Sequence, residues 1–151
     1  METTKQFSIF MVNKPGILSH ILREFDKAKI NITALTVMDS VEHGVLRIVP
    51  ESVDKMRNAL IQTNIQFNET DVLCVTLPNK SGAFAAITEK LSKAHINIAY
   101  AYVTSGAKGG KTTAVLKVAD VKKAMKVLHG AGTPAGDARL LERRSLSARK
   151  G

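Results

Sequence analysis

The feature that most limits how this chain can fold is an internal repeat with an offset of 66 residues. The segment Asn13–Ile32 aligns with Asn79–Ile98, and nine of its twenty positions are identical. Farther along, the offset grows to 70, where Val45–Ile48 aligns with Val115–Val118. A repeat of this length is too long for a solenoid and long enough for a small domain. The sequence therefore predicts two copies of one small fold.

The first copy shows the periodicities of strands and helices in the order β-α-β-β-α-β. Alternating apolar residues predict strands, and apolar residues spaced by three and four predict amphipathic helices. Pro15 suits the first turn of the first helix. This order is the split-βαβ or ferredoxin-like arrangement, with two helices on one face of an antiparallel sheet. The predicted elements are Phe7–Val12, Ile17–Ala28, Asn31–Met38, Val45–Val49, Val53–Ile61 and Ile65–Glu69.

The second copy repeats this order as far as its second helix. We expect Ser81 to cap its first helix and Gly130 or Gly132 to end its last one. A fourth strand is not apparent: either Ala138–Glu142 supplies it late or the second sheet is one strand short. The predicted elements are Val72–Leu77, Ala83–Ala94, Ile98–Thr104, Thr113–Val118 and Val121–Leu128.

The fold class is therefore α+β, and the chain divides into three parts. We assign residues 1–70 to unit one, 71–133 to unit two and 134–151 to a basic tail. Only Glu69, Thr70 and Asp71 separate the units, so we expect one continuous sheet of eight strands, or seven without the last. The tail has five basic and two acidic side chains and little to bury, which is typical of a solvated segment.

Composition restricts the class of protein. With 44% hydrophobic and 23% charged residues, the chain has enough apolar content for a packed core. The single cysteine, Cys74, excludes an intramolecular disulfide, and no apolar run is long enough for a membrane span. We expect a cytoplasmic protein that does not bind membranes. The net charge of +9 indicates good solubility and non-specific association with acidic partners, and it does not identify a specific partner.

Four patterns that could support chemistry are better explained otherwise. The glycine-rich segment Ser105–Thr112 lacks Walker A spacing and joins two strands, so it is typical of a hairpin tip. The four histidines have no metal-ligand spacing, and Cys74 lies in an apolar strand. No acid pair or Ser-His-Asp arrangement is apparent. We therefore expect no catalytic residues, no metal and no cofactor.

The ferredoxin-like fold is shared with RNA-binding RRM domains, which stack bases on aromatic residues of the central strands. The corresponding hairpin strands here, Val45–Val49 and Ala114–Val118, are aliphatic. Only Tyr100 and Tyr102 cluster, two residues apart on one strand. We expect no specific binding of nucleic acid, and any weak binding through the tail should fall steeply with salt.

The duplicated asparagines are the remaining candidates. Asn13 and Asn31, like Asn79 and Asn97, lie eighteen residues apart, on either side of a predicted first helix. From this bracketing we expect both side chains to approach the N-terminus of that helix, where free N–H groups attract a carboxylate. The alternative is that they are turn formers that satisfy their own backbone.

The pattern Asn13-Lys14-Pro15-Gly16-Ile17-Leu18, followed by Ile30-Asn31-Ile32, resembles the ACT domain. The second copy, with Ser81 in place of the proline, is looser. The resemblance implies a small-molecule-binding module, most often for amino acids, whose ligand lies between the strand-to-helix loop of one module and the second strand of its neighbour. The site residues that it implies are Asn13, Pro15, Gly16, Ile17, Leu18 and Asn31, and by the repeat Asn79, Gly82 and Asn97.

The sequence thus predicts a non-catalytic sensor of an amino acid that forms a homodimer or larger assembly through ACT–ACT contacts. One rival is a structural or protein-interaction module whose ligand site has decayed. Another is an acylphosphatase-like hydrolase on the same fold, which needs an arginine in the first loop, where this chain has Lys14.

Overall fold

The computed structural model describes residues 1–39, 43–107 and 109–130. Ten elements follow one another in the order expected for two split-βαβ units, except that one strand stands between the second and third helices where two were expected. They are β1 (Glu2–Val12), α1 (Ile17–Lys27), β2 (Ile32–Asp39), β3 (His43–Pro50), α2 (Val53–Gln62), β4 (Phe67–Pro78), α3 (Ala83–Lys93), β5 (Ile98–Ala107), β6 (Lys111–Val118) and α4 (Val121–His129).

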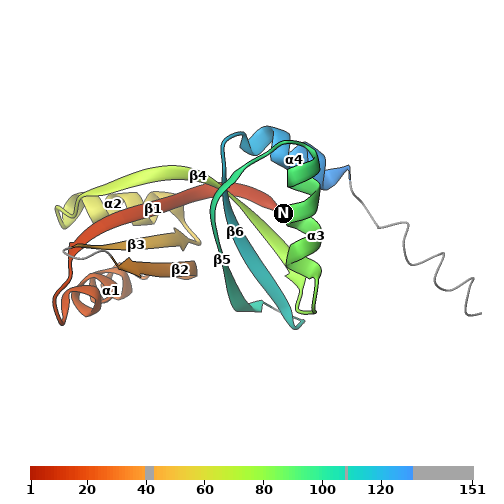
Figure 1. Cartoon of the computed structure of the whole chain (residues 1–151). Coiled ribbons are helices and arrows are strands. Elements are labelled where there is room, and N and C mark those ends of the chain that lie inside the picture. The colour runs from red at the N-terminus through yellow and green to blue at the C-terminus, as the bar shows by residue number, and fades with distance from the viewer. Residues whose placement is uncertain (40–42, 108, 131–151) are drawn as a thin grey trace, which may run out of the picture.

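The described strands form one antiparallel sheet in the order β2-β3-β1-β4-β6-β5 (Figure 1). In the register of β1 with β4, Ile9 lies opposite Phe67 and Thr3 opposite Leu73. Odd-numbered residues of both strands therefore share one face. The cores under the two helix pairs both lie on that face, which confirms the α+β fold with helices on one side. These cores include Phe7, Ile9, Phe25 and Leu60 in unit one and Leu73, Val75, Leu91 and Leu116 in unit two.

The prediction of separate strands at the junction of the units was wrong. β4 is one strand that runs through residues 70 and 71, where a linker was expected. Its first half belongs with unit one, because the guanidinium of Arg57 on α2 binds both carboxylate oxygens of Glu69. These hydrogen bonds lower the pKa of the Glu69 carboxyl below its ordinary value. The division at residue 70 stays a prediction.

The N-terminal half of β1 takes the place expected for a fourth strand of unit two. Residues 2–6 pair antiparallel with Thr70–Cys74, the first-strand region of unit two, while residues 7–12 pair with β3 inside unit one. β1 and β4 are therefore long strands that run through both units (Figure 1). The described part of the sheet has six strands rather than the seven or eight expected. The proposed late strand at 138–142 and the tail at 134–151 lie outside the described residues.

The sheet is curled, so its helix-free face closes on itself. The edge strands β2 and β5 approach each other across this face. A third core fills the curl with side chains from both units: Ala34, Val49, Val72, Cys74 and Val115. Burial raises the pKa of the Cys74 thiol to about 11, which keeps it in the unreactive protonated form. Cys74 is thus a core residue, as expected.

Most local predictions agree with the structure. Gly130 follows the last residue of α4, and the glycine-rich segment joins β5 to β6 with Gly109 and Gly110 at positive φ. Ser81 and Pro15 are exceptions. The residue before α3 is Gly82, and no side chain caps this helix. Pro15 lies before the first turn of α1, which begins at Ile17 after Gly16.

Candidate functional site

The two loops that carry the repeated motif have the same conformation. In the first, the N–H of Lys14 donates to the carbonyl of Val12, and in the second the N–H of Lys80 donates to that of Pro78, both at 2.9 Å. Gly16 and Gly82 precede α1 and α3 with φ of 89° and 80°, in the left-handed region that favours glycine. The sequence repeat is therefore a repeat of loop geometry.

Replacing Gly16 with alanine is expected to lower the free energy of unfolding by about 1–2 kcal/mol, the cost of a left-handed conformation for a residue with a Cβ. A Cβ there would meet nothing within 4 Å, so the effect comes from the backbone alone. Urea unfolding measures it, with the exposed Ser19→Ala in the first turn of α1 as the control. An unchanged midpoint would contradict the loop geometry.

The helices after these loops begin without a side-chain cap, although the N–H of Ile17 donates to the carbonyl of Lys14 at 3.4 Å and the N–H of Ala83 to that of Lys80 at 3.3 Å. Neither α1 nor α3 has a side-chain cap or an acid in its first turn. The other two helices are capped: Ser52 accepts from the N–H of Lys55, and Asp120 accepts from the N–H of Lys123. Uncapped N–H groups and the positive end of the helix dipole attract an anion. The two repeated loops therefore share a chemistry that the starts of α2 and α4, the other two described helices, do not have.

Asp39 is a functional candidate that the sequence analysis missed. It ends β2, and its carboxylate accepts a hydrogen bond from the amide of Asn13 at 3.2 Å. The predicted topology could have indicated Asp39, because β1 and β2 are parallel strands joined by a helix. Such strands end at the same edge of the sheet, which places Asp39 near Asn13. The loop after β1 therefore has an uncapped helix terminus for an anion and an exposed carboxylate for a cation beside it.

The expectation that Asn31 approaches the N-terminus of α1 was wrong. Asn31 follows the C-terminal end of this helix, and an eleven-residue helix is about 16 Å long. Its amide donates to the carboxylate of Glu51 at 2.8 Å. Within one chain, Asn13, Pro15, Gly16, Ile17 and Leu18 lie together in the loop and the first turn, whereas Asn31 lies at the opposite end of α1.

Unit two has the same separation. Asn79 and Gly82 lie in the loop before α3, and Asn97 lies beyond its C-terminal end. Asn97 lines an open hollow of about 500 Å³ together with Thr88, Ser92 and His95. The repeat places Ser105 where unit one has Asp39, so the second loop has no matching carboxylate.

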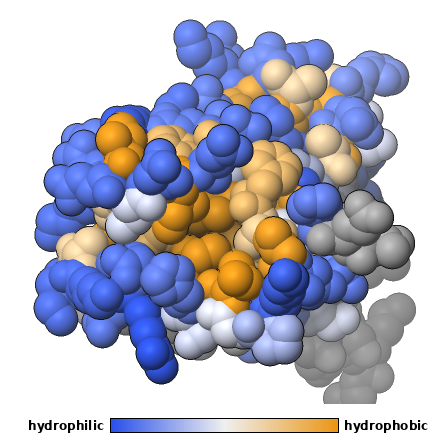
Figure 2. All heavy atoms as spheres, turned by 90° about the vertical axis from the view of Figure 1, so that its left-hand side faces the viewer, coloured by the Kyte–Doolittle hydropathy of each residue, from blue (hydrophilic) through white to orange (hydrophobic). Residues whose placement is uncertain are grey.

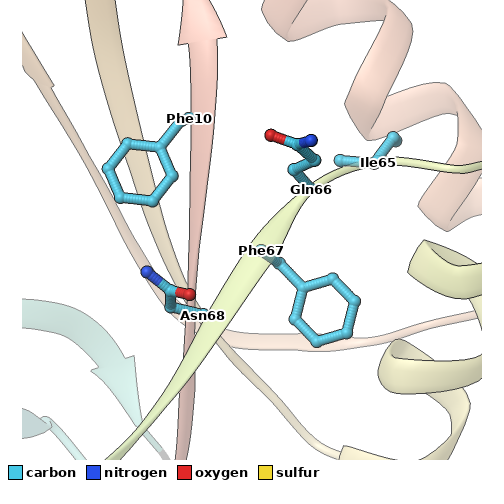
Figure 3. Close-up of a pocket in the computed structure, with 5 residues that line it drawn as sticks. All are labelled: Phe10, Ile65, Gln66, Phe67 and Asn68. Atoms are coloured by element: carbon cyan, nitrogen blue, oxygen red, sulfur yellow. The ribbon is translucent and has the colours of Figure 1, made fainter.

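Two further hollows lie in unit one. One, of about 410 Å³, lies on the outer side of α1 and includes Leu18 and Leu22. The other, of about 490 Å³, lies beside β1 and the start of β4. There the side chains of Phe10, Gln66 and Asn68 border the open side, while Ile65 and Phe67 point toward the helix side of the sheet (Figure 3). None of these three hollows includes Asn13, Gly16 or Ile17.

Residues 1–39, 43–107 and 109–130 contain no group of three or more histidine, cysteine or acidic side chains placed to hold a metal ion. No helix in the same ranges is long and apolar enough to cross a membrane.

Comparison with known proteins adds the family. A search of curated protein sequences gave no significant match. Among solved structures, protein BT0572 from Bacteroides thetaiotaomicron is 32% identical, with a TM-score of 0.77 over 85% of this chain and 88% of its own. The regulatory subunit of aspartate kinase from Thermus thermophilus shares the fold at 11% identity, with a TM-score of 0.60 over 88% of this chain and 99% of its own. The profile of the ACT domain pair family matches residues 2–131, so the chain belongs to that family.

Proposed function

We propose that this protein is a non-catalytic regulatory module that binds a free amino acid. The observation that carries the proposal is the first loop, where the uncapped start of α1 lies beside the carboxylate of Asp39. A regulatory role is supported by the family and by the similar regulatory subunit of aspartate kinase. The loop offers Lys14 but no arginine, which disfavours the acylphosphatase-like alternative. We also propose that the protein acts in the cytoplasm.

The two ends of an amino acid fit two parts of this loop. The α-carboxylate would lie against the first N–H groups of α1, where the helix dipole favours negative charge. The α-ammonium would bind the carboxylate of Asp39, which Asn13 orients through its 3.2 Å hydrogen bond. Unit two has the same loop without this carboxylate, so we expect its site to bind more weakly.

A second copy of the chain would complete the site. β2 is at the edge of the sheet, and an antiparallel pairing of β2 with its symmetry mate would extend the sheet. If the two-fold axis passes through the middle of β2, Asp39 at the end of this strand lies opposite Ile32 of the partner subunit. Asn31 of the partner subunit would then lie next to the first loop. This arrangement accounts for an asparagine that is remote from the loop in its own chain.

The side chains of β2 are suited to such pairing. Ile32, Leu35, Val37 and Met38 are 37–45% exposed, although all four are apolar. Figure 2 looks at the end of the molecule where β2 ends and shows an apolar patch enclosed by hydrophilic groups. An exposed apolar edge strand is an aggregation hazard unless another strand covers it. We therefore propose a homodimer through β2.

A thermal-shift screen of the twenty amino acids tests the proposal. A ligand at ten times its dissociation constant stabilises the folded state by RT ln 11, about 1.4 kcal/mol. For a chain of this size the melting temperature should rise by roughly 3–6 °C. No shift with any amino acid at millimolar concentration would favour the structural rival, a module with a decayed site.

A further inference from the structure

The helix layers leave the two units loosely connected. The cores under α1–α2 and under α3–α4 share no residue. Between the units the sheet is continuous only through the pairing of β1 with β4. Strands of one sheet can twist relative to one another, so this ladder alone does not fix one angle between the units. The contacts that can fix the angle lie on the helix-free face, inside the curl of the sheet.

A polar cluster joins β5 of unit two to β1 at the point where β1 passes from unit two into unit one. The side chain of Gln6 on β1 is fully buried. Its amide N–H donates to the hydroxyl of Tyr100 at 2.7 Å, and its carbonyl accepts from the hydroxyl of Tyr102 at 3.0 Å. Both tyrosines are on β5, more than 90 residues away in the sequence. Burial raises the pKa of the Tyr102 phenol, so its hydroxyl remains a hydrogen-bond donor at ordinary pH.

Arg47 on β3 forms the second bridge. Its guanidinium carbon lies 3.7 Å from the centre of the Tyr100 ring, and Nη1 donates to the sulfur of Met38 on β2 at 2.8 Å. Its Nε is buried without a hydrogen-bond partner, a cost that the stacking on Tyr100 offsets. The Tyr100 side chain therefore contacts Gln6 on β1, where this strand passes between the units, and Arg47 on β3 of unit one.

We propose that Gln6, Arg47, Tyr100 and Tyr102 form a latch that fixes the angle between the two ACT units and couples their motions. Opening the curl separates all of these groups together and leaves the buried amide of Gln6 without its tyrosine partners. Because the buried amide of Gln6 has hydrogen-bond partners for both its N–H and its carbonyl in this arrangement, the closed curl is favoured as one discrete state. The two repeated loops, at the far ends of the two units, are then held in one relative orientation (Figure 1).

Substitutions in the latch test this role, and Ser8 provides a matched control. Tyr102→Phe removes one hydroxyl that holds β5 to β1 at the point where β1 passes between the units. Ser8→Ala removes another acceptor of the same Gln6 amide, at 3.3 Å. Ser8 lies two residues from Gln6 on β1, so this hydrogen bond does not join two strands. Spin labels on cysteines at Asn58 and Lys126 report the distance between α2 and α4, because both positions are exposed and Cys74 is buried. Hydrogen exchange of the Val72 and Val115 amides reports opening of the third core.

In the unsubstituted chain and in Ser8→Ala, we expect one narrow distance distribution. The double variant Tyr102→Phe with Arg47→Met should broaden or shift this distance distribution. Tyr102→Phe alone should speed hydrogen exchange of the Val72 and Val115 amides roughly 5- to 150-fold, the range for one buried unsatisfied group. Unfolding of the double variant should separate into two transitions, one for each unit. The proposal is overturned if the double variant keeps the narrow distribution, or if Ser8→Ala changes exchange as much as Tyr102→Phe. Both readouts need no amino acid, so they are independent of the proposed function.

Discussion

A chain that lacks residues 1–5 is expected to lose a large part of its stability, although these residues include no side chain of the three apolar cores. Residues 2–5 pair with Asp71–Cys74 and cover the edge of unit two. Their removal exposes Val72, Leu73 and Cys74, which are at most 4% exposed. Burial of a side chain such as leucine contributes about 1.5–3 kcal/mol, and each backbone hydrogen bond about 1 kcal/mol.

A loss of about 4 kcal/mol is therefore a conservative expectation for this truncation, against a total stability of about 5–15 kcal/mol. The melting temperature should fall by roughly 8–16 °C. Hydrogen exchange should show that β6 loses protection more than β3. As a control, replacing Glu2, Thr3, Thr4 and Lys5 with other strand-forming residues should preserve the stability, because the backbone makes the ladder. An unchanged melting temperature in the truncated chain would show that unit two does not need β1.

Asp39→Asn is expected to have the largest effect on ligand binding. A hydrogen bond to a charged group contributes about 1.5–3 kcal/mol, so loss of the ammonium partner should weaken amino-acid binding roughly 10- to 150-fold. The stability of the free protein should change little, since Asp39 is exposed. Titration calorimetry with the amino acid that gives the largest thermal shift measures the effect.

Two controls make this prediction specific. Asp26→Asn makes the same change of charge on the exposed side of α1, where Asp26 lies 3.8 Å from Lys29, and should leave the affinity unchanged. The 2-hydroxy acid analogue of the ligand has no ammonium group, so it should bind Asp39→Asn and the unsubstituted protein equally. If Asp39→Asn weakens the amino acid and the hydroxy acid by the same factor, Asp39 does not bind the ammonium.

The local structure could be predicted from the sequence because it depends on neighbouring residues. The glycines at 16 and 82, the apolar periodicity of α1 and α3 and the hairpin between β5 and β6 all follow from short-range patterns. The internal repeat made these predictions stronger, since the same motif had to form the same loop twice. The uncapped start of α3 was not predicted, since Ser81 is a residue type that commonly caps a helix.

The features that join the units could not be read in this way. Residues 2–6 are polar and lack apolar alternation, yet they form a strand because their backbone pairs with β4. Thr70 and Asp71 resemble a linker because they too are polar and lack apolar alternation. The latch joins Gln6 to tyrosines more than 90 residues away, and the curl that brings them together depends on the whole sheet. The error on Asn31 was avoidable, since a helix between parallel strands carries the chain from one edge of the sheet to the other.

Mixing two defective variants tests most directly whether the site forms between copies of the chain. Asp39→Asn disables the loop side of the proposed site, and Asn31→Ala disables the strand side. In a mixed dimer, one of the two sites combines the intact Asp39 of one copy with the intact Asn31 of the other. If the variants are unfolded and refolded together, random pairing should restore about one quarter of all sites with the original affinity. Each variant refolded alone should show none. A mixture that binds no better than the separate variants would contradict a site shared between two copies.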